Sequence, residues 1–337
     1  KICFHVDDSA IAQKGQELWQ WYLNKLAEKY EFTLGELSHF LGVRYRFAPD
    51  RSSVHLDHEQ HILKMLEQFG MLNCKPNRVP FNNGMQAPSL ANVPTSEEEK
   101  ARAKAYPYME QVGHLHFIEG IRKDIIYPVK VASRFMTNHG DAMHTWVKAI
   151  MRYLKGTATD GILIKRNADL RLRVFSDANH AKCVDTRRSM SGVIIKLGGN
   201  TVFAKCKYQR IVSHSSCESE LMCLDFALCR AEQIRYLAES LGATVQGTIT
   251  AFVDNQATMS LAVNPVQPDR NIHIHARYFY VRDLCNEGRF VVLYLDSASM
   301  IADLLVTYKG PSSFLVHKRR VLGYAYITDK PGLLTYD

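Results

Sequence analysis

The spacing of hydrophobic residues along the chain changes its period near residue 170. In residues 15–30, 58–70 and 107–155, apolar side chains recur at helical spacing, which predicts helices. From residue 170 onward, apolar and polar residues alternate over short stretches, which is typical of strands. The change of period therefore predicts a first half rich in helices and a second half built around a sheet.

The first half also contains short strand-like segments and one polar stretch. The opening stretch KICFHV is interpreted as a strand and the following DDSA as its turn. Two further stretches, FLGVRYRF and SVHLDHE, flank the turn PDRS and predict a hairpin. Residues 84–104 turn polar, with Pro88, Pro94 and the acidic run SEEE, so we expect a loop or linker there.

The second half predicts a layered α/β domain whose sheet begins with a meander. LRLRVFSD alternates like a strand, and MSGVIIKL and NTVFAKC flank Gly198-Gly199, a two-residue hairpin turn. A long helix is expected over residues 216–241. It is followed by the strand GTITAFVD, the helix NQATMSLAV, the strand FVVLYL and the helix SASMIADLLV. This order of elements indicates an α/β sandwich.

Four carboxylates lie at informative places in this second half. Asp177 and Asp254 end two strands that run parallel if the long helix crosses over between them, so both would lie at one edge of the sheet. Glu220 heads the apolar stripe of the long helix and therefore faces the sheet. Asp303 lies among apolar residues of the last predicted helix. The four acids are expected to converge.

Converging carboxylates need a partner, because burial and mutual repulsion oppose their charge. Oxygen ligands without a Cys or His cluster indicate Mg²⁺ or Mn²⁺, and two such ions about 3.5–4 Å apart support phosphodiester cleavage. Each acid alone also has a simpler explanation. Asp177 would be a turn acid, Glu220 a first-turn acid favoured by the helix dipole, and Asp254 a helix cap. The joint pattern of the acids is more specific than any one of them.

The composition favours a protein that binds nucleic acid and argues against a zinc, disulfide-rich or membrane-spanning protein. The chain has 337 residues and a formal net charge of +8, and such a basic excess attracts polyanions, nucleic acid first among them. Its eight scattered cysteines form no CxxC pair, which argues against a zinc site or disulfide framework and for a reducing compartment. No apolar run approaches about 18 residues, so no membrane span is expected. Because the chain starts at Lys1 without a signal-peptide pattern, we expect a fragment or a processed piece.

An ordered set of motifs runs through nearly the whole chain. The motifs are HVDD, LGELSHFLGV, PYMEQVGHLHFI, RYLKGT, FSDANHA, RRSMSG, LGGN, SSCESEL, VDNQATMSLAVNPV and ADLL. In this order they resemble the C-terminal part of a copia-type retrotransposon Pol polyprotein, its reverse transcriptase and RNase H region. The resemblance covers about residues 1–322.

The resemblance implies a fold and a division of the chain. It implies an α/β protein in which an RNase H-like mixed-sheet domain is preceded by a partial reverse-transcriptase palm and a helical thumb and connection. The implied segments are a palm end and thumb over 1–84, a polar linker over 85–106, a helical connection over 107–168, the RNase H-like domain over 169–322 and a tail over 323–337.

The resemblance also implies an activity. Carried over by motif, the RNase H acids are the same four residues as in the sheet argument: Asp177, Glu220, Asp254 and Asp303. The implied reaction is hydrolysis of the RNA strand of an RNA–DNA hybrid with two metal ions, Mg²⁺ or alternatively Mn²⁺, and recognition of the 2′-hydroxyl would tell RNA from DNA. Six basic residues are candidates for phosphate contacts: Arg171, Arg173, Arg187, Arg188, Lys205 and Lys207. Taken singly, each of these six is better explained as a solvated surface charge.

The resemblance further implies partners and a location. The partners are the RNA–DNA hybrid, template–primer nucleic acid and the rest of the Pol polyprotein, without a membrane. The location is intracellular, in cytoplasmic virus-like particles with access to the nucleus.

The first part of the chain resembles a polymerase whose site is incomplete. Asp7 and Asp8 match the metal-binding turn, with His5 in place of the family's Tyr. Polymerase chemistry needs a third acid and the nucleotide-binding fingers, which would precede Lys1. We therefore expect this chain alone not to polymerise DNA, although it can still hold a template–primer.

Around the RNase H acids the chain departs from the family pattern. The replaced positions are Asn179, His180, Lys182, Ala204, His275 and Phe279. The family's TKPL after ADLL is absent, while His273 is kept without separate indication of a catalytic role. These departures leave open a catalytically decayed module that binds hybrid nucleic acid without cutting it. A basic α/β protein with no nucleic-acid role is a third interpretation.

Overall fold

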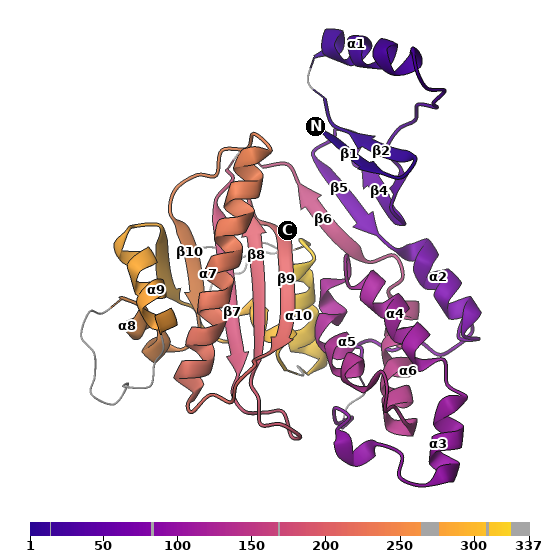
Figure 1. The fold of residues 1–337 in the computed structure, drawn as a ribbon, viewed down its shortest axis with the longest axis vertical. Coiled ribbons are helices and arrows are strands. Elements are labelled where there is room, and N and C mark those ends of the chain that lie inside the picture. Colours follow the sequence, from indigo (N-terminus) through magenta and orange to yellow (C-terminus); the bar gives the residue numbers. More distant parts are fainter. Residues whose placement is uncertain (14, 82–83, 168, 264–275, 308–309, 325–337) are drawn as a thin grey trace.

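The chain forms a domain built around a five-stranded sheet and, beside it, a part made of helices and short strands (Figure 1). The computed structural model describes residues 1–13, 15–81, 84–167, 169–263, 276–307 and 310–324, with residues 276–279 described by their backbone alone. Among these residues no helix is both long and apolar enough to cross a membrane.

A five-stranded mixed sheet organises the second half of the chain, in the order β11-β10-β7-β8-β9. Its strands are β7 (Leu172–Asn179), β8 (Met190–Leu197), β9 (Asn200–Tyr208), β10 (Ile249–Val253) and β11 (Phe290–Tyr294). The first three form an antiparallel meander, and β10 runs parallel to both β7 and β11. This meander followed by two crossover strands is the topology of an RNase H-like domain, so the expected fold class is confirmed.

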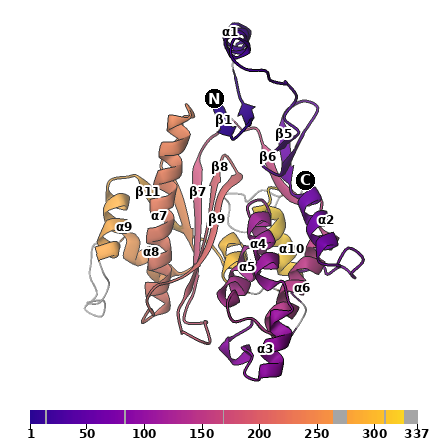
Figure 2. The ribbon, with the colours of Figure 1, turned by 45° about the vertical axis from the view of Figure 1, so that its right-hand side comes forward.

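Helices cover both faces of this sheet (Figure 2). One face packs against α7 (Ser216–Ser240), α8 (Gln256–Val263) and α9 (Ala276–Asn286). The apolar stripe of α7 is buried against alternate residues of β7 and β8, such as Val174 and Val193. The other face, with Phe175 and Ile194, packs against the 3₁₀ helix η5 (Ile301–Leu305), α10 (Pro311–Val321) and the helices of the connection.

The connection is a helical bundle whose core continues into the sheet domain. Its helices are α4 (Tyr108–Ile118), η2 (Lys123–Ile125), α5 (Ile126–Ala132), η3 (Ser133–Phe135) and α6 (Asp141–Gly156). Helix α6 buries Trp146, Ile150 and Leu154, as the periodicity predicts. The same cluster of buried residues includes Phe175 of the sheet. The connection and the sheet domain therefore share one core.

The polar stretch before this bundle is not only a linker. It contains η1 (Leu90–Asn92) and α3 (Glu97–Lys104). Ser96 caps α3, because its Oγ accepts the Glu99 N–H at 3.2 Å while the Glu99 carboxylate accepts the Ser96 N–H at 3.2 Å. The expectation of a loop across this stretch was wrong, because the acidic run SEEE begins a capped helix.

A four-stranded antiparallel sheet joins distant parts of the first half. Its strands are β3 (His39–Phe40), β4 (Val43–Phe47), β5 (Ser53–Asp57) and β6 (Gly161–Lys165), and β5 leads into α2 (Glu59–Gln68). The hairpin around PDRS is confirmed as β4 and β5. Strand β6 follows the connection helices yet pairs with β5, with Ser53 opposite Lys165. Part of the segment interpreted as a helical connection thus belongs to this sheet.

The beginning of the chain is a two-stranded hairpin, β1 (Ile2–His5) and β2 (Asp8–Ile11), followed by α1 (Gln16–Ala27). Asp8 opens β2 opposite His5, so the turn lies at Val6 and Asp7 and does not include the whole of DDSA. Helix α1 forms as its periodicity predicts, but it has no buried residue.

Candidate active site

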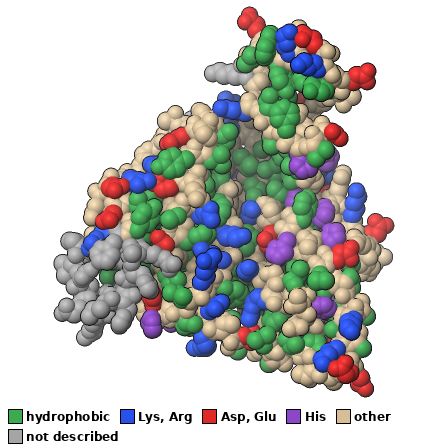
Figure 3. Space-filling view, in the orientation of Figure 1, with side chains coloured by type: hydrophobic (Ala, Val, Ile, Leu, Met, Phe, Trp, Pro, Cys, Tyr) green, Lys and Arg blue, Asp and Glu red, His purple; other side chains and the backbone are tan. Residues whose placement is uncertain are grey.

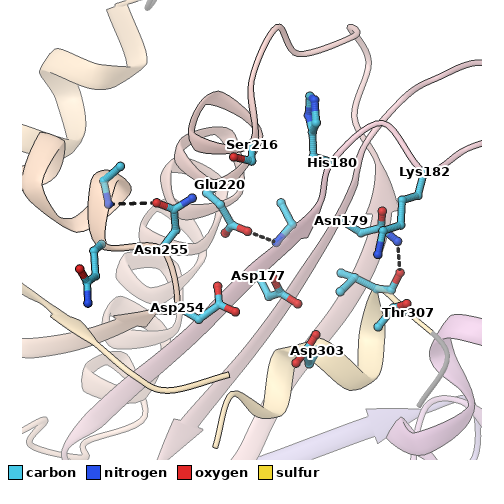
Figure 4. A pocket seen from close by; sticks show the side chains of 14 residues that line it. Asp177, Asn179, His180, Lys182, Ser216, Glu220, Asp254, Asn255, Asp303 and Thr307 are labelled. Carbon is cyan, nitrogen blue, oxygen red and sulfur yellow. Dashed lines mark hydrogen bonds between the residues drawn. The ribbon is translucent and has the colours of Figure 1, made fainter. Parts of the chain in front are cut away.

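The structure brings together all four acids that the sequence singles out. Asp177 lies in β7, Glu220 in α7, Asp254 directly after β10 and Asp303 in η5, and all four line one pocket. One carboxylate oxygen from each of Asp177, Glu220 and Asp254 lies within 4.8 Å of the other two. Figure 4 shows these three side chains pointing toward one another, with Asp303 approaching from η5.

The topology of the sheet explains this convergence. Because β7 and β10 are parallel neighbours, their carboxyl ends lie at the same edge of the sheet. Asp177 is a strand residue opposite Gly192 of β8 and is 5% exposed, so its explanation as a turn acid was wrong.

Neighbouring residues take the structural roles considered for Glu220, as a first-turn acid, and for Asp254, as a helix cap. Ser215 caps α7, and Glu218 is the first-turn acid, whose Oε2 accepts the N–H of His214 at 2.6 Å. Asn255 caps α8, because its Oδ1 accepts the N–H groups of Ala257 and Thr258 at 3.0 and 3.2 Å. Glu220 and Asp254 therefore do not cap a helix, and both line the pocket.

Neighbouring groups hold two of the acids in place. The N–H of Ala178 donates to Glu220 Oε1 at 3.1 Å, which ties α7 to the end of β7. Ser297 Oγ donates to Asp254 Oδ2 at 2.8 Å. Both acids therefore reach the pocket through carboxylates whose orientation is fixed by hydrogen bonds.

Burial and mutual repulsion make the cluster costly to ionise. Burial and the nearby carboxylates of Glu220, Asp303 and Asp254 hold the pKa of Asp177 well above its usual range. Burial, followed by repulsion from Asp254, raises the pKa of Glu220 to about 8. Asp177 Oδ2 and Glu220 Oε2 are both buried and accept no hydrogen bond from the described residues.

These properties fit a divalent cation. Paired oxygen ligands with repelling charges and unsatisfied lone pairs are what a hard cation such as Mg²⁺ neutralises. A cation bound by Asp177, Glu220 and Asp254 would remove the repulsion that raises the pKa values of Asp177 and Glu220. The residues that are present thus suit the expected metal.

The pocket has a volume of about 540 Å³ and polar walls. Asn179 Nδ2 donates to the carbonyl of Val306 at 2.7 Å, which links the end of β7 to the segment after η5. His180 Nδ1 lies 3.1 Å from Ser213 Oγ, and Lys182 and Thr307 complete this side of the pocket. Three replaced family positions, Asn179, His180 and Lys182, therefore line the pocket.

One contributor to the site was missed at the sequence level. Gly192 lies opposite Asp177, and a Cβ there would come within 2.7 Å of Val306 Cγ1 and 2.9 Å of the Ala302 carbonyl oxygen. The missing side chain is what lets η5, and with it Asp303, pack against β8. The signal was the glycine of the RRSMSG motif inside an otherwise apolar strand.

The remaining predicted positions lie elsewhere. Asp7 and Asp8 are exposed on the hairpin, which lies toward the end of the sheet opposite the carboxyl end of β7 (Figure 1). Their role in a polymerase site stays a prediction. Ala204 in β9 is opposite Ile194 and packs against the shared core. His273 and His275 lie outside the described residues, as does the side chain of Phe279.

The predicted phosphate-contact residues differ in their surroundings. Arg187 and Arg188 are exposed in the loop after β7, whereas Arg171 is paired with Asp169 at 2.5 Å. The Nζ of Lys207 lies 3.2 Å from the centre of the Phe226 ring. Figure 3 shows Lys and Arg side chains gathered over the middle of one face, near β9 and α7. Their contact with phosphates stays a prediction.

Comparisons with known proteins place the chain among transposon proteins. No protein-family model matches it. The retrovirus-related Pol polyprotein from transposon TNT 1-94 of Nicotiana tabacum is 28% identical over 322 residues, covering 95% of this chain and 24% of that protein. The retrovirus-related Pol polyprotein from transposon RE1 of Arabidopsis thaliana is 28% identical over 311 residues, covering 92% of this chain and 21% of that protein. The chain thus spans about a quarter or less of the length of these Pol relatives.

A shorter relative matches over most of its own length. An uncharacterized mitochondrial protein of Arabidopsis thaliana is 30% identical over 233 residues, covering 68% of this chain and 92% of that protein. Among solved structures, LC11-RNase H1 in complex with an RNA/DNA hybrid is similar at 17% identity with a TM-score of 0.30, covering 40% of this chain and 94% of that one. The fold assignment rests on the strand order of the five-stranded sheet. With the motifs in the family's order along nearly the whole sequence, the chain belongs to the family of copia-type, retrovirus-related transposon Pol polyproteins.

Proposed function

We propose that the RNase H-like domain of this chain hydrolyses the RNA strand of RNA–DNA hybrids with two divalent metal ions, Mg²⁺ being the preferred ion. The observation that carries the proposal is the convergence of Asp177, Glu220 and Asp254, whose carboxylate oxygens lie within 4.8 Å of one another at the edge of an RNase H-like sheet. Two of these acids also carry buried oxygens that accept no hydrogen bond from described residues.

The chain's own residues would hold the metal ions and present the substrate to them. Asp177, Glu220 and Asp254 would hold the metal ions, and Asp303 would add to the negative charge of the site. The N–H of Ala178 and the hydroxyl of Ser297 keep Glu220 and Asp254 oriented before any ion arrives. When bound, such ions supply the positive charge that activates water and stabilises the leaving 3′ oxygen.

Binding of the hybrid would depend on basic residues around the pocket. Lys182 lines the pocket, and Arg187 and Arg188 are exposed on the same loop. Phosphate contacts make affinity fall as salt rises, because binding releases counterions. Affinity for an RNA–DNA hybrid should therefore weaken steeply with salt, and affinity that does not respond to salt would contradict phosphate contacts. Association with the remaining segments of a Pol polyprotein and an intracellular location belong to the same proposal.

Cleavage of a labelled RNA–DNA hybrid in Mg²⁺ tests the proposal directly. The wild-type chain should cut the RNA strand, and Asp177→Asn should reduce the rate by about 10³-fold or more, because it removes a central charge of the metal site. Circular dichroism and hybrid binding should show that both proteins are folded. If the folded wild-type chain binds the hybrid but does not cut it, the alternative of a decayed binding module replaces the enzyme.

A further inference from the structure

A group of histidines lies outside the acidic pocket, where the connection meets α2. His58 directly precedes α2, His61 lies in the first turn of α2, and His114 lies on α4. The ring of Phe117 packs between them, with its centroid 4.7 Å from that of His58 and 4.5 Å from that of His61. The proposed reaction uses none of these side chains.

Two of these imidazoles face each other at a short distance. His61 Nε2 and His114 Nδ1 are 3.1 Å apart, and the two rings make no other hydrogen bond among the described residues. Both side chains are half-buried, so solvent reaches them. The pKa of His61 is lowered by burial and by the neighbouring His114 and Lys64, which keeps its lone pair available at neutral pH.

This separation fits the bite of a single transition-metal ion. Two nitrogens at about 2.0–2.1 Å from one ion, with an N–metal–N angle between about 90° and 109°, lie about 2.9–3.4 Å apart. The observed 3.1 Å falls within that range. Imidazole pairs select Zn²⁺, Ni²⁺ and Cu²⁺ and not Mg²⁺, so this site would differ from the carboxylate cluster in the metal it takes.

We propose that His61 and His114 form a second metal site, which binds Zn²⁺ or a similar transition-metal ion between α2 and α4. Water would complete the coordination, because both side chains are partly exposed. Such an ion ties the helix after the four-stranded sheet to the first helix of the connection. The two helices are already bridged nearby by Gln68 Nε2, which donates to Glu110 Oε1 at 2.5 Å. Metal binding to the folded chain would stabilise it in proportion to the free metal concentration.

Zinc titration of the whole chain tests the site. Calorimetry in excess Mg²⁺, which occupies the acidic pocket, should show one Zn²⁺ site in the wild-type chain, together with a rise in melting temperature that EDTA reverses. His61→Gln and His114→Gln should each weaken this site by more than about tenfold, since even partners outside the first ligand shell matter by 10–100-fold.

His116→Gln is the matched control, because His116 lies on the same helix but faces Glu119, with His116 Nδ1 3.2 Å from Glu119 Oε1. It should bind Zn²⁺ as the wild-type chain does. Unchanged Zn²⁺ binding in both His61→Gln and His114→Gln, or an equal loss in His116→Gln, would overturn the proposal.

A measurement on the unaltered chain covers the case in which a variant does not fold. Zn²⁺ should shift the imidazole NMR signals of His61 and His114 and leave that of His116 in place, and shifts confined to other histidines would refute the site. Neither calorimetry nor NMR measures hybrid cleavage. A negative result for the zinc site therefore does not contradict the proposed nuclease, and absence of cleavage does not contradict the zinc site.

Discussion

Two sets of acids in this chain occupy opposite environments. Asp7 and Asp8 are neighbours in sequence, and both are exposed on the hairpin at the beginning of the chain. Asp177 and Glu220 are 43 positions apart in sequence, yet each is 5% exposed and they share one pocket. Among the described residues, the group built around Asp177 is where three potential ligands come within 4.8 Å of one another.

The difference shows what turns acids into a candidate metal site. Exposed carboxylates are solvated by water and need no cation, whereas buried ones repel each other and raise one another's pKa. Two acids that are adjacent in sequence concentrate negative charge at one place. Only the crossover between parallel strands brings acids from distant positions together and buries them. The following changes test how far this contrast reaches.

Of the changes considered below, neutralising Glu220 should have the largest effect. Glu220→Gln should lower the rate of hybrid cleavage by about 10²–10³-fold, because it removes a charge from the metal site while its amide oxygen still accepts the Ala178 N–H. Glu218→Gln is the control, because Glu218 lies in the first turn of α7 outside the pocket, and this variant should keep most of the activity. Equal losses of cleavage in the two variants would show that the rate does not depend on the buried carboxylates of the pocket.

The second effect concerns stability as a function of pH without metal. The pKa of Glu220 is raised from 4.5 to about 8, so the folded chain keeps a proton that the unfolded chain has already lost. The free energy of unfolding should therefore fall as pH rises between these two values, by a slope of up to about 1.4 kcal/mol per pH unit for one proton. Urea unfolding over this range, with and without excess Mg²⁺, measures the effect.

Mg²⁺ should remove much of this loss, and Glu220→Gln should reduce the slope in metal-free protein. A metal-free chain that gains stability over the same range of pH would contradict the buried repulsion.

The third effect tests the packing that brings Asp303 to the cluster. Gly192→Ala places a methyl group within 2.7 Å of Val306 Cγ1, so η5 must move. We expect a loss of about 1–3 kcal/mol in the free energy of unfolding, together with slower hybrid cleavage. Gly113→Ala in α4 is the control, because a Cβ there meets no atom within 4 Å, and it should stabilise the helix by up to about 1 kcal/mol. Similar losses in both variants would argue against this role of Gly192.

The smallest effect is expected at the exposed pair. The double change Asp7→Asn and Asp8→Asn should alter the free energy of unfolding by less than about 0.5 kcal/mol and leave hybrid cleavage unchanged, because both side chains are exposed and lie outside the pocket. Thermal melts and the cleavage assay check this. A clear loss of cleavage would show that the hairpin contributes to the nuclease site.

Local periodicity was sufficient to predict much of the fold. The apolar stripe that begins at Glu220 is buried against the sheet, and the turn at Gly198-Gly199 joins β8 and β9 as expected. Helix α3 was missed because its composition is that of a loop. Its capping box, Ser96 with Glu99, was nevertheless visible in the sequence.

Contacts between distant segments could not be predicted in this way. The close approach of η5 to Gly192 depends on tertiary packing, and the segment of Asp303 is a short 3₁₀ helix where a longer helix was expected. The capping role of Asn255, which leaves Asp254 to the pocket, depends on backbone geometry that composition does not encode. The pairing of β5 with β6 joins segments separated by the whole connection.

That last pairing has a consequence for the order in which the protein can fold during synthesis. Strand β5 emerges from the ribosome roughly 100 residues before its partner β6, so its outer edge has no neighbour until the connection has been made. Strand β6 is in turn held from its other side, because the Leu163 N–H donates to the carbonyl of Leu322 at 2.8 Å and the Gly161 N–H donates to the hydroxyl of Tyr324 at 3.2 Å. The four-stranded sheet is thus completed by residues that are made long after its first strands, so a ribosome that stalled before Leu322 would leave a β-edge available for pairing with another chain.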